Sequence, residues 1–154
     1  MVYLIAIVVA ALDQWIKWTV STRMPLNSVI PIWPHVLDLY YVQNQGAAFS
    51  ILLNQRWLLM LVAILVIAVI VYVDRRYVGR DRGLKVALGL LLGGAVGNLI
   101  DRIWHGYVID YIYVQIIHYP VFNLADSCIV LSVLYLIVRA WRKRGGNPDR
   151  TDES

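Results

Sequence analysis

Two aspartates in the second half of the chain are the residues best suited to acid–base chemistry. Asp110 and Asp126 lie beside apolar runs and have no Lys or Arg within four positions on either side. If two such carboxylates meet near an apolar boundary, their repulsion keeps one of them protonated at neutral pH. A protonated and an ionised carboxylate that share a water can hydrolyse a peptide bond, as in aspartic proteases. A cation pathway through a helix bundle would also use aspartates, so the pair alone leaves both classes open.

The other polar residues gather in short groups with helical spacing. Positions three or four apart lie on one face of a helix, so each group is expected to point into a bundle. Ionisable groups inside a membrane cost roughly 2.5–3.5 kcal/mol each on insertion scales, which makes a buried, paired position the expected one. The groups are Asp13 with Lys17; Asn98 with Asp101 and Arg102; and Asn123 with Asp126.

Simple structural roles account for several of these residues. Asp13 and Lys17 are expected to form an ion pair along one helix, and Asp101 is expected to be neutralised by its neighbour Arg102. Glycines at 89, 93 and 97 form a stripe of small residues, which is typical of close helix packing. The single cysteine, Cys128, lies in an apolar run and has no partner for an intramolecular disulfide.

Composition indicates a membrane protein. The chain has 154 residues, of which 60% are hydrophobic and 16% charged, against roughly 25% charged residues in soluble domains. Its mean hydropathy is +0.63. The formal net charge is +4, but the basic residues lie beside apolar runs, which argues against a nucleic-acid partner. The three histidines, at 35, 105 and 118, form no helical ligand pair, so no metal or other cofactor is expected.

Four segments are long and apolar enough to span a bilayer, which needs about 20 residues. Residues 1–140 are predicted to form one transmembrane domain, and residues 141–154 a disordered cytoplasmic tail. The first connection contains "HVLDLYYVQN", whose β-branched and aromatic residues predict one or two strands. The fold class is therefore an all-α polytopic membrane protein with a small β-element. The predicted spans are Val2–Val20, Trp57–Val73, Leu84–Ile103 and Val121–Val138.

The basic residues predict the orientation of these spans. They concentrate in the second connection and at the start of the tail, so the positive-inside rule places both termini in the cytoplasm. Every polar group then lies at the extracytoplasmic boundary of the bilayer, in a single layer. A transporter would need polar groups at several depths, and a non-catalytic assembly factor would not need two unpaired aspartates. The residues counted are Arg75, Arg76, Arg80, Arg82 and Lys85, then Arg139, Arg142, Lys143 and Arg144.

The chain resembles the bacterial lipoprotein signal peptidases, the signal peptidase II family. The resemblance extends over nearly the whole chain in five ordered blocks, and its one departure is Tyr111, where the family pattern favours Phe. The blocks are "DQWIK" (13–17), "NQGAAFS" (44–50), "GGAVGNLIDR" (93–102), "GYVIDY" (106–111) and "FNLADS" (122–127).

The resemblance implies a multi-pass aspartic endopeptidase of the bacterial inner membrane. Its expected fold has four transmembrane helices, a small extracytoplasmic β-element and a short interfacial helix, and its expected active site faces outward. The substrate would be a prolipoprotein, cut just before a Cys that carries diacylglycerol. The enzyme would act as a monomer among membrane lipids, without a metal or a covalent intermediate.

The resemblance also implies roles for individual residues. Asp110 and Asp126 would be catalytic, while Asp13, Lys17 and Asp101 would be structural. The residues that would bind substrate or line the site are Asn44, Gly46, Asn98, Arg102 and Asn123.

Overall fold

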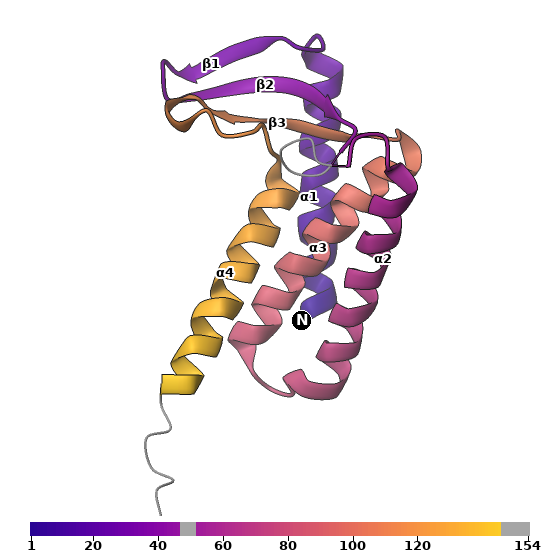
Figure 1. Cartoon of the computed structure of the whole chain (residues 1–154), viewed down its shortest axis with the longest axis vertical. Helices are drawn as coiled ribbons and strands as arrows, with labels where there is room; N and C mark the ends of the chain where they lie inside the picture. The colour runs from indigo at the N-terminus through magenta and orange to yellow at the C-terminus, as the bar shows by residue number, and fades with distance from the viewer. Residues whose placement is uncertain (47–51, 146–154) are drawn as a thin grey trace, which may run out of the picture.

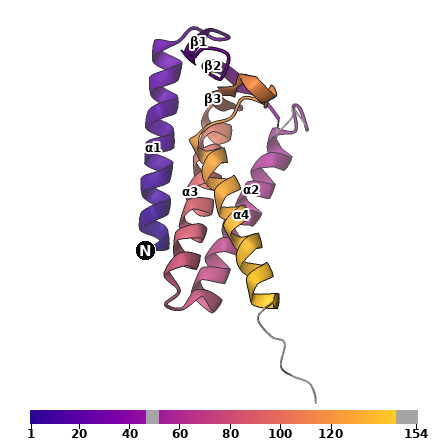
Figure 2. The same ribbon diagram turned by 90° about the vertical axis from the view of Figure 1, so that its left-hand side faces the viewer.

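Four long helices form a bundle that carries a small sheet at one end (Figures 1 and 2). The computed structural model describes residues 1–46 and 52–145. Within them, four helices are long and apolar enough to cross a membrane, as the sequence predicts. They are α1 (Val2–Arg23), α2 (Arg56–Val73), α3 (Arg82–Trp104) and α4 (Leu124–Gly145).

The largest boundary differences concern α4. It begins three residues later than predicted, at Leu124, because Asn123 caps its first turn through the bond from the Asp126 N–H to Asn123 Oδ1 (2.9 Å). It continues to Gly145, so residues 141–145 are helical rather than part of a disordered tail. The prediction for residues 146–154 lies outside the described residues.

Helix α3 packs against the other three helices, and its glycines permit this. A Cβ on Gly93 would lie 2.7 Å from Val9 Cβ and 2.8 Å from the Ala6 carbonyl oxygen of α1. A Cβ on Gly94 would lie 2.5 Å from the carbonyl oxygen of Ala125 on α4. Contacts this short do not occur in folded proteins, so the stripe serves close helix packing, as predicted.

The sheet has three antiparallel strands in the order β1-β2-β3. Strand β2 (Leu37–Asn44) lies within the stretch predicted to form strands, whereas β1 (Val29–Trp33) precedes that stretch and was not predicted. Strand β3 (Val108–Val114) was not predicted. It pairs with β2 in a register that sets Asp110 opposite Val42. The residues around Asp110 are therefore held by a strand ladder rather than by a loop.

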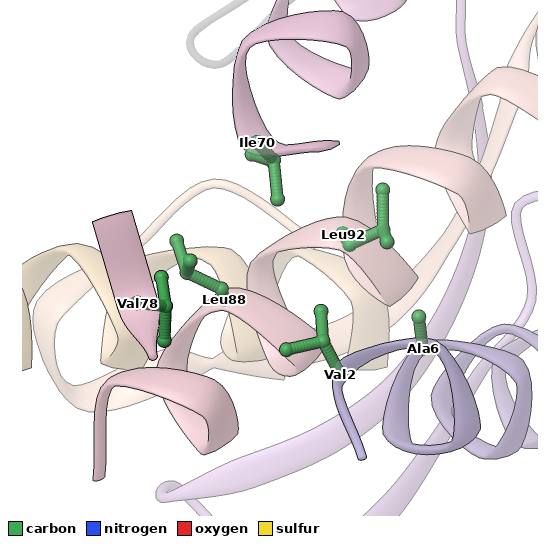
Figure 3. Packing of buried hydrophobic residues seen from close by; sticks show 6 residues of the cluster. All are labelled: Val2, Ala6, Ile70, Val78, Leu88 and Leu92. Atoms are coloured by element: carbon green, nitrogen blue, oxygen red, sulfur yellow. The ribbon is translucent and has the colours of Figure 1, made fainter. Parts of the chain in front are cut away.

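Two hydrophobic clusters hold the molecule together. One lies in the bundle away from the sheet and includes Val78 of the π-helical turn Asp74–Val78 that follows α2 (Figure 3). The other joins α1 to the sheet and contains Ile109 and Tyr111, the two neighbours of Asp110. Burial of both neighbours fixes the path of β3 beside the bundle.

The short interfacial helix stays a prediction. Between β3 and α4 the chain forms only a 3-10 turn, Gln115–Ile117. In the first connection, residues 47–51 lie outside the described part of the chain.

A buried ion cluster joins α1 to α3. Lys17 Nζ lies 2.7 Å from Asp13 Oδ2 and 3.0 Å from Asp101 Oδ2, and all three side chains are at most 2% exposed. The predicted Asp13–Lys17 pair is therefore present. The predicted partner of Asp101 was wrong: Lys17, not Arg102, neutralises it, because the Arg102 guanidinium is directed to the carbonyl oxygens of Asn98 and Gly46. Gln14 Nε2 also donates to Asp101 Oδ1, at 2.8 Å.

Replacement of Lys17 by Met should strongly destabilise the bundle. The change leaves two buried carboxylates without a cation, and breaking a buried pair costs on the order of 3–5 kcal/mol. Thermal unfolding in detergent measures the loss. Arg23→Met is the matched control, because it removes an exposed positive charge from the same helix. Equal stability of the two variants would contradict this role for Lys17.

Candidate active site

Asp110 lies on β3 between two amide side chains. Asn44 Nδ2, from β2, donates to Asp110 Oδ2 at 2.9 Å, and Asn123 Nδ2 donates to Asp110 Oδ1 at 2.7 Å. The side chain is almost fully buried, at 1% exposure. Burial, and next the nearby charge of Asp126, raise the pKa of Asp110 from 3.8 to about 7, against the opposing effect of the two amide bonds. Asp110 is thus able to hold a proton near neutral pH.

Asp126 lies in the first turn of α4. The N–H groups of this turn that have no acceptor within the helix are bonded to side chains. The Asp126 N–H bonds to Asn123 Oδ1 at 2.9 Å, and the Asn123 N–H bonds back to Asp126 Oδ2 at 3.3 Å. This reciprocal arrangement has the form of a capping box. The Leu124 N–H donates to the Tyr111 hydroxyl at 3.2 Å, and the Ala125 N–H donates to Asp13 Oδ1 at 3.0 Å. Side chains from β3 and α1 therefore fix the turn that carries Asp126.

Asn98 connects Asp126 to the ion cluster. Its Nδ2 donates to Asp126 Oδ1 at 2.7 Å. Its Oδ1 accepts from Lys17 Nζ at 2.9 Å and from Asn123 Nδ2 at 3.1 Å. Because both of these partners are donors, the amide of Asn98 has one satisfactory orientation, and that orientation presents its N–H to Asp126.

Arg102 lies one turn further along α3 and contacts the end of β2. Its guanidinium donates to the carbonyl oxygens of Gly46 (3.1 Å) and Asn98 (3.3 Å). The Gly46 N–H in turn donates to Asn44 Oδ1 at 2.9 Å. Arg102 therefore supports the same loop end that orients Asn44 toward Asp110.

A cavity of about 640 Å³ is lined by residues of β2, β3 and the adjoining ends of α3 and α4. One part of its lining is polar, and the remainder is apolar and includes side chains of α4. This mixed lining suits a ligand that has both a peptide and a hydrocarbon part. The polar residues include Asn44, Asn98, Arg102, Asp110 and Asp126, together with Gln43 and Gln45, and the apolar ones include Leu53, Val108, Phe122, Ile129 and Val130.

The residues predicted for the site lie in two adjacent layers. Asp13, Lys17 and Asp101 lie beneath the cavity and do not line it. The seven others either line it or bond directly to a residue that does: Asn44, Gly46, Asn98, Arg102, Asp110, Asn123 and Asp126.

Sequence reasoning missed two contributors. Gln14 lies between Asp13 and Lys17, and an amide inside an apolar span was a usable signal. Tyr111 enters the sequence analysis only as a departure from the family pattern, yet its hydroxyl caps α4. His105, five residues before Asp110, stacks on Tyr107 with ring centroids 5.7 Å apart. Within residues 1–46 and 52–145, no group of three His, Cys, Asp or Glu side chains is arranged to hold a metal ion.

Solved structures resemble this fold over almost its whole length. A bacterial membrane enzyme solved by the in meso method at 2.3 Å resolution matches 99% of this chain and 94% of its own, with a TM-score of 0.89 and 31% identity. A second bacterial membrane enzyme, solved at 1.9 Å, matches 90% of this chain and 91% of its own, with a TM-score of 0.83 and 33% identity.

Sequence comparisons give the family. A lipoprotein signal peptidase of Halalkalibacterium halodurans is 42% identical over 92% of this chain and 94% of its own length. One of Symbiobacterium thermophilum is 48% identical over 84% of this chain and 86% of its own. The family described as Signal peptidase (SPase) II matches residues 5–142. With a family match over most of the chain, a four-helix fold, and Asp110 and Asp126 lining one cavity, the chain belongs to the signal peptidase II family.

Proposed function

We propose that this chain is a membrane aspartic endopeptidase that removes the signal peptide from prolipoproteins, cutting just before a diacylglyceryl-modified Cys. The observation that carries the proposal is the pair formed by Asp110 and Asp126, here called the dyad. The two carboxylates come from different elements, line one cavity and are framed by the amides of Asn44, Asn98 and Asn123. The names of the relatives agree with this activity.

In the proposed mechanism, one aspartate of the dyad acts as the acid and the other acts as the base. Asp110 is buried with a pKa of about 7, which suits the carboxyl that keeps the proton. Asp126 lies at the N-terminal end of α4, accepts a hydrogen bond from Asn98, and is assigned the role of the base. In the proposed reaction, Asp126 takes a proton from the attacking water. Asp110 donates its hydrogen to the scissile carbonyl oxygen and stabilises the tetrahedral intermediate.

The three asparagines and Arg102 hold the dyad in place. Each asparagine donates to one of the two carboxylates, so neither carboxylate needs a cationic partner that would abolish its basicity. Arg102 lines the cavity and bonds to Gly46, which makes it a suitable contact for the peptide backbone of a substrate. Asp13, Lys17 and Asp101 position these residues from below and touch no substrate.

The proposed orientation places the sheet and the cavity outside the bacterial inner membrane and both termini in the cytoplasm. Its support is the concentration of Lys and Arg in the connection between α2 and α3 and at the end of α4. Trp15, Trp18, Trp33, Trp57 and Trp104, all more than 60% exposed, belong to segments at or near the sheet end, as expected at a membrane boundary. A lipid-anchored substrate would present its scissile bond at this level and leave its acyl chains in the bilayer. The enzyme is proposed to act as a monomer.

Asp110→Asn and Asp126→Asn should each reduce turnover by roughly 10²- to 10⁴-fold, because general acid–base catalysis contributes about that much. The double variant should be scarcely slower than either single one, since the two groups act as a unit. Cleavage of a lipidated prolipoprotein peptide measures this. Asp74→Asn, which changes an aspartate outside the cavity lining, is the control and should keep normal turnover. Full activity in either single dyad variant would remove that aspartate from the proposed mechanism.

Cleavage should be bell-shaped in pH. Activity should decrease as pH rises through about 7, where Asp110 loses its proton. It should also decrease in acid, where the second carboxylate becomes protonated. The two apparent pKa values belong to the coupled dyad rather than to either residue. A flat rate profile from pH 5 to 9 would contradict shared-proton chemistry.

The pH dependence of protein stability offers a second test of whether folding raises the pKa of Asp110. The pKa of Asp110 is raised on folding, from 3.8 to about 7, so the folded protein binds more protons than the unfolded chain between these values. The contribution of Asp110 to stability is therefore complete in acid and decreases as pH rises through this window. The melting temperature of Asp110→Asn should lack this decrease. An identical pH dependence in the wild type and the variant would show that Asp110 titrates normally.

The diacylglyceryl group should be required for efficient cleavage, because the apolar part of the cavity lining has no partner in an unmodified peptide. One peptide, with and without the modification, should be compared at equal concentration in the same detergent. The unmodified peptide should be cut far more slowly. Equal rates would favour a general membrane protease over a lipoprotein signal peptidase.

A further inference from the structure

A second surface, at the end of the bundle away from the sheet, combines apolar, aromatic and basic residues on one helix. Here α2 passes into the π-helical turn Asp74–Val78. An open groove is lined by side chains three, four, seven and eight positions after the first, so all of them share one helix face. The lining residues are Ala68, Val71, Tyr72, Arg75 and Arg76. In Figure 1 the end of α2 lies at the opposite end of the bundle from the sheet.

The turn that carries the two arginines is anchored to the core. Val78 is 3% exposed and belongs to the cluster that contains Val2 and Leu88 (Figure 3). Arg75 and Arg76 lie on the same turn and are exposed. The rings of Tyr72 and Tyr77 make an edge-on contact, with centroids 6.0 Å apart. The backbone that carries the two arginines is therefore held against the core of the bundle.

In the part of the chain that the structure describes, neither guanidinium group has an anionic partner. Among the described residues, neither Arg75 nor Arg76 forms an ion pair, whereas Arg139 is paired with Asp81 at the same end of the bundle. Asp74 belongs to the turn but does not line the groove. Guanidinium groups match phosphate in shape and charge, and they form paired hydrogen bonds to it. The unpaired arginines are thus suited to a phosphodiester group.

The order of residue types along the groove follows the order of chemical groups at the headgroup end of a lipid. At 1.5 Å per residue, Ala68 and Arg75 are separated by roughly 10 Å along the helix axis. Ala68 and Val71 offer an apolar surface for an acyl chain, Tyr72 lies at the level expected for an interfacial aromatic ring, and the arginines follow. Only 11% of the apolar window of this span is buried inside the protein, so α2 presents most of its side chains to lipid.

We propose that this groove binds one anionic phospholipid, with its phosphodiester on Arg75 and Arg76 and an acyl chain along Val71 and Ala68. The site is distinct from the dyad cavity and shares no lining residue with it. It gives α2, the span least covered by protein, a fixed position relative to the membrane surface at the end away from the sheet.

The test is lipid competition on the full chain in a nonionic detergent. The protein is incubated with phosphatidylglycerol and phosphatidylcholine of identical chains, and native mass spectrometry counts the lipid that each molecule retains. The wild type should retain one phosphatidylglycerol in preference. The double variant Arg75→Gln/Arg76→Gln should lose this preference by roughly 30-fold, from a contribution of about fivefold for each basic residue near an anionic surface.

Two further variants distinguish lipid binding at the groove from a general attraction of lipid to positive charge. Arg80→Gln/Arg82→Gln removes the same charge from the same connection but no groove residue, and it should keep most of the preference. Ala68→Trp fills the apolar half without a change of charge, and it should weaken phosphatidylglycerol retention. All variants should cleave a lipidated peptide normally, which verifies folding.

Three results would overturn the proposal. Equal losses in the two arginine double variants would mean that only diffuse positive charge attracts lipid. Unchanged retention in Ala68→Trp would remove the acyl-chain part of the site. Displacement of the lipid by glycerol phosphate at equal concentration would indicate a site for a free anion instead.

Discussion

The buried ammonium of Lys17 is the interaction on which the candidate active site depends. Its three partners each lead to a different part of the site. Asp13 bonds to the Ala125 N–H at the start of α4, Asp101 Oδ2 accepts the Ile109 N–H beside Asp110 at 3.1 Å, and Asn98 donates to Asp126. One cation thus links α1, α3, β3 and α4. A charge this far from water is tolerable only because the partners lie within 3.0 Å of it.

The structure separates its carboxylates into two kinds by their partners. Asp13 and Asp101 contact an ammonium, which compensates their charge. Asp110 and Asp126 are bonded by amides, which orient a carboxylate without supplying a positive charge. Burial then favours a proton on one of the pair. Membership in the signal peptidase II family and the proposed peptide-bond hydrolysis both agree with this division.

Local patterns in the sequence were sufficient for the helices and for the grouping of the polar residues. Hydropathy predicted four spans, and the spacing of Asp13 from Lys17 predicted their ion pair. Long-range partners were not predictable in this way. Adjacency suggested Arg102 as the partner of Asp101, but neighbours in a helix point in different directions, and Lys17 comes from another helix. Strand β3 was missed because its pairing partner, β2, lies about 70 residues earlier.

The most direct measurement is the infrared spectrum of the protonated carboxyl group near pH 7, taken as the difference between the wild type and each dyad variant. Use of ¹³C-labelled aspartate identifies the band, and subtraction removes any contribution from Asp13 and Asp101. A shared proton predicts a carboxylic acid band in the wild type that is lost in Asp110→Asn. The band should disappear above the dyad's upper apparent pKa, near 7. A wild-type spectrum without that band, or a band that persists unchanged in Asp110→Asn, would contradict the account.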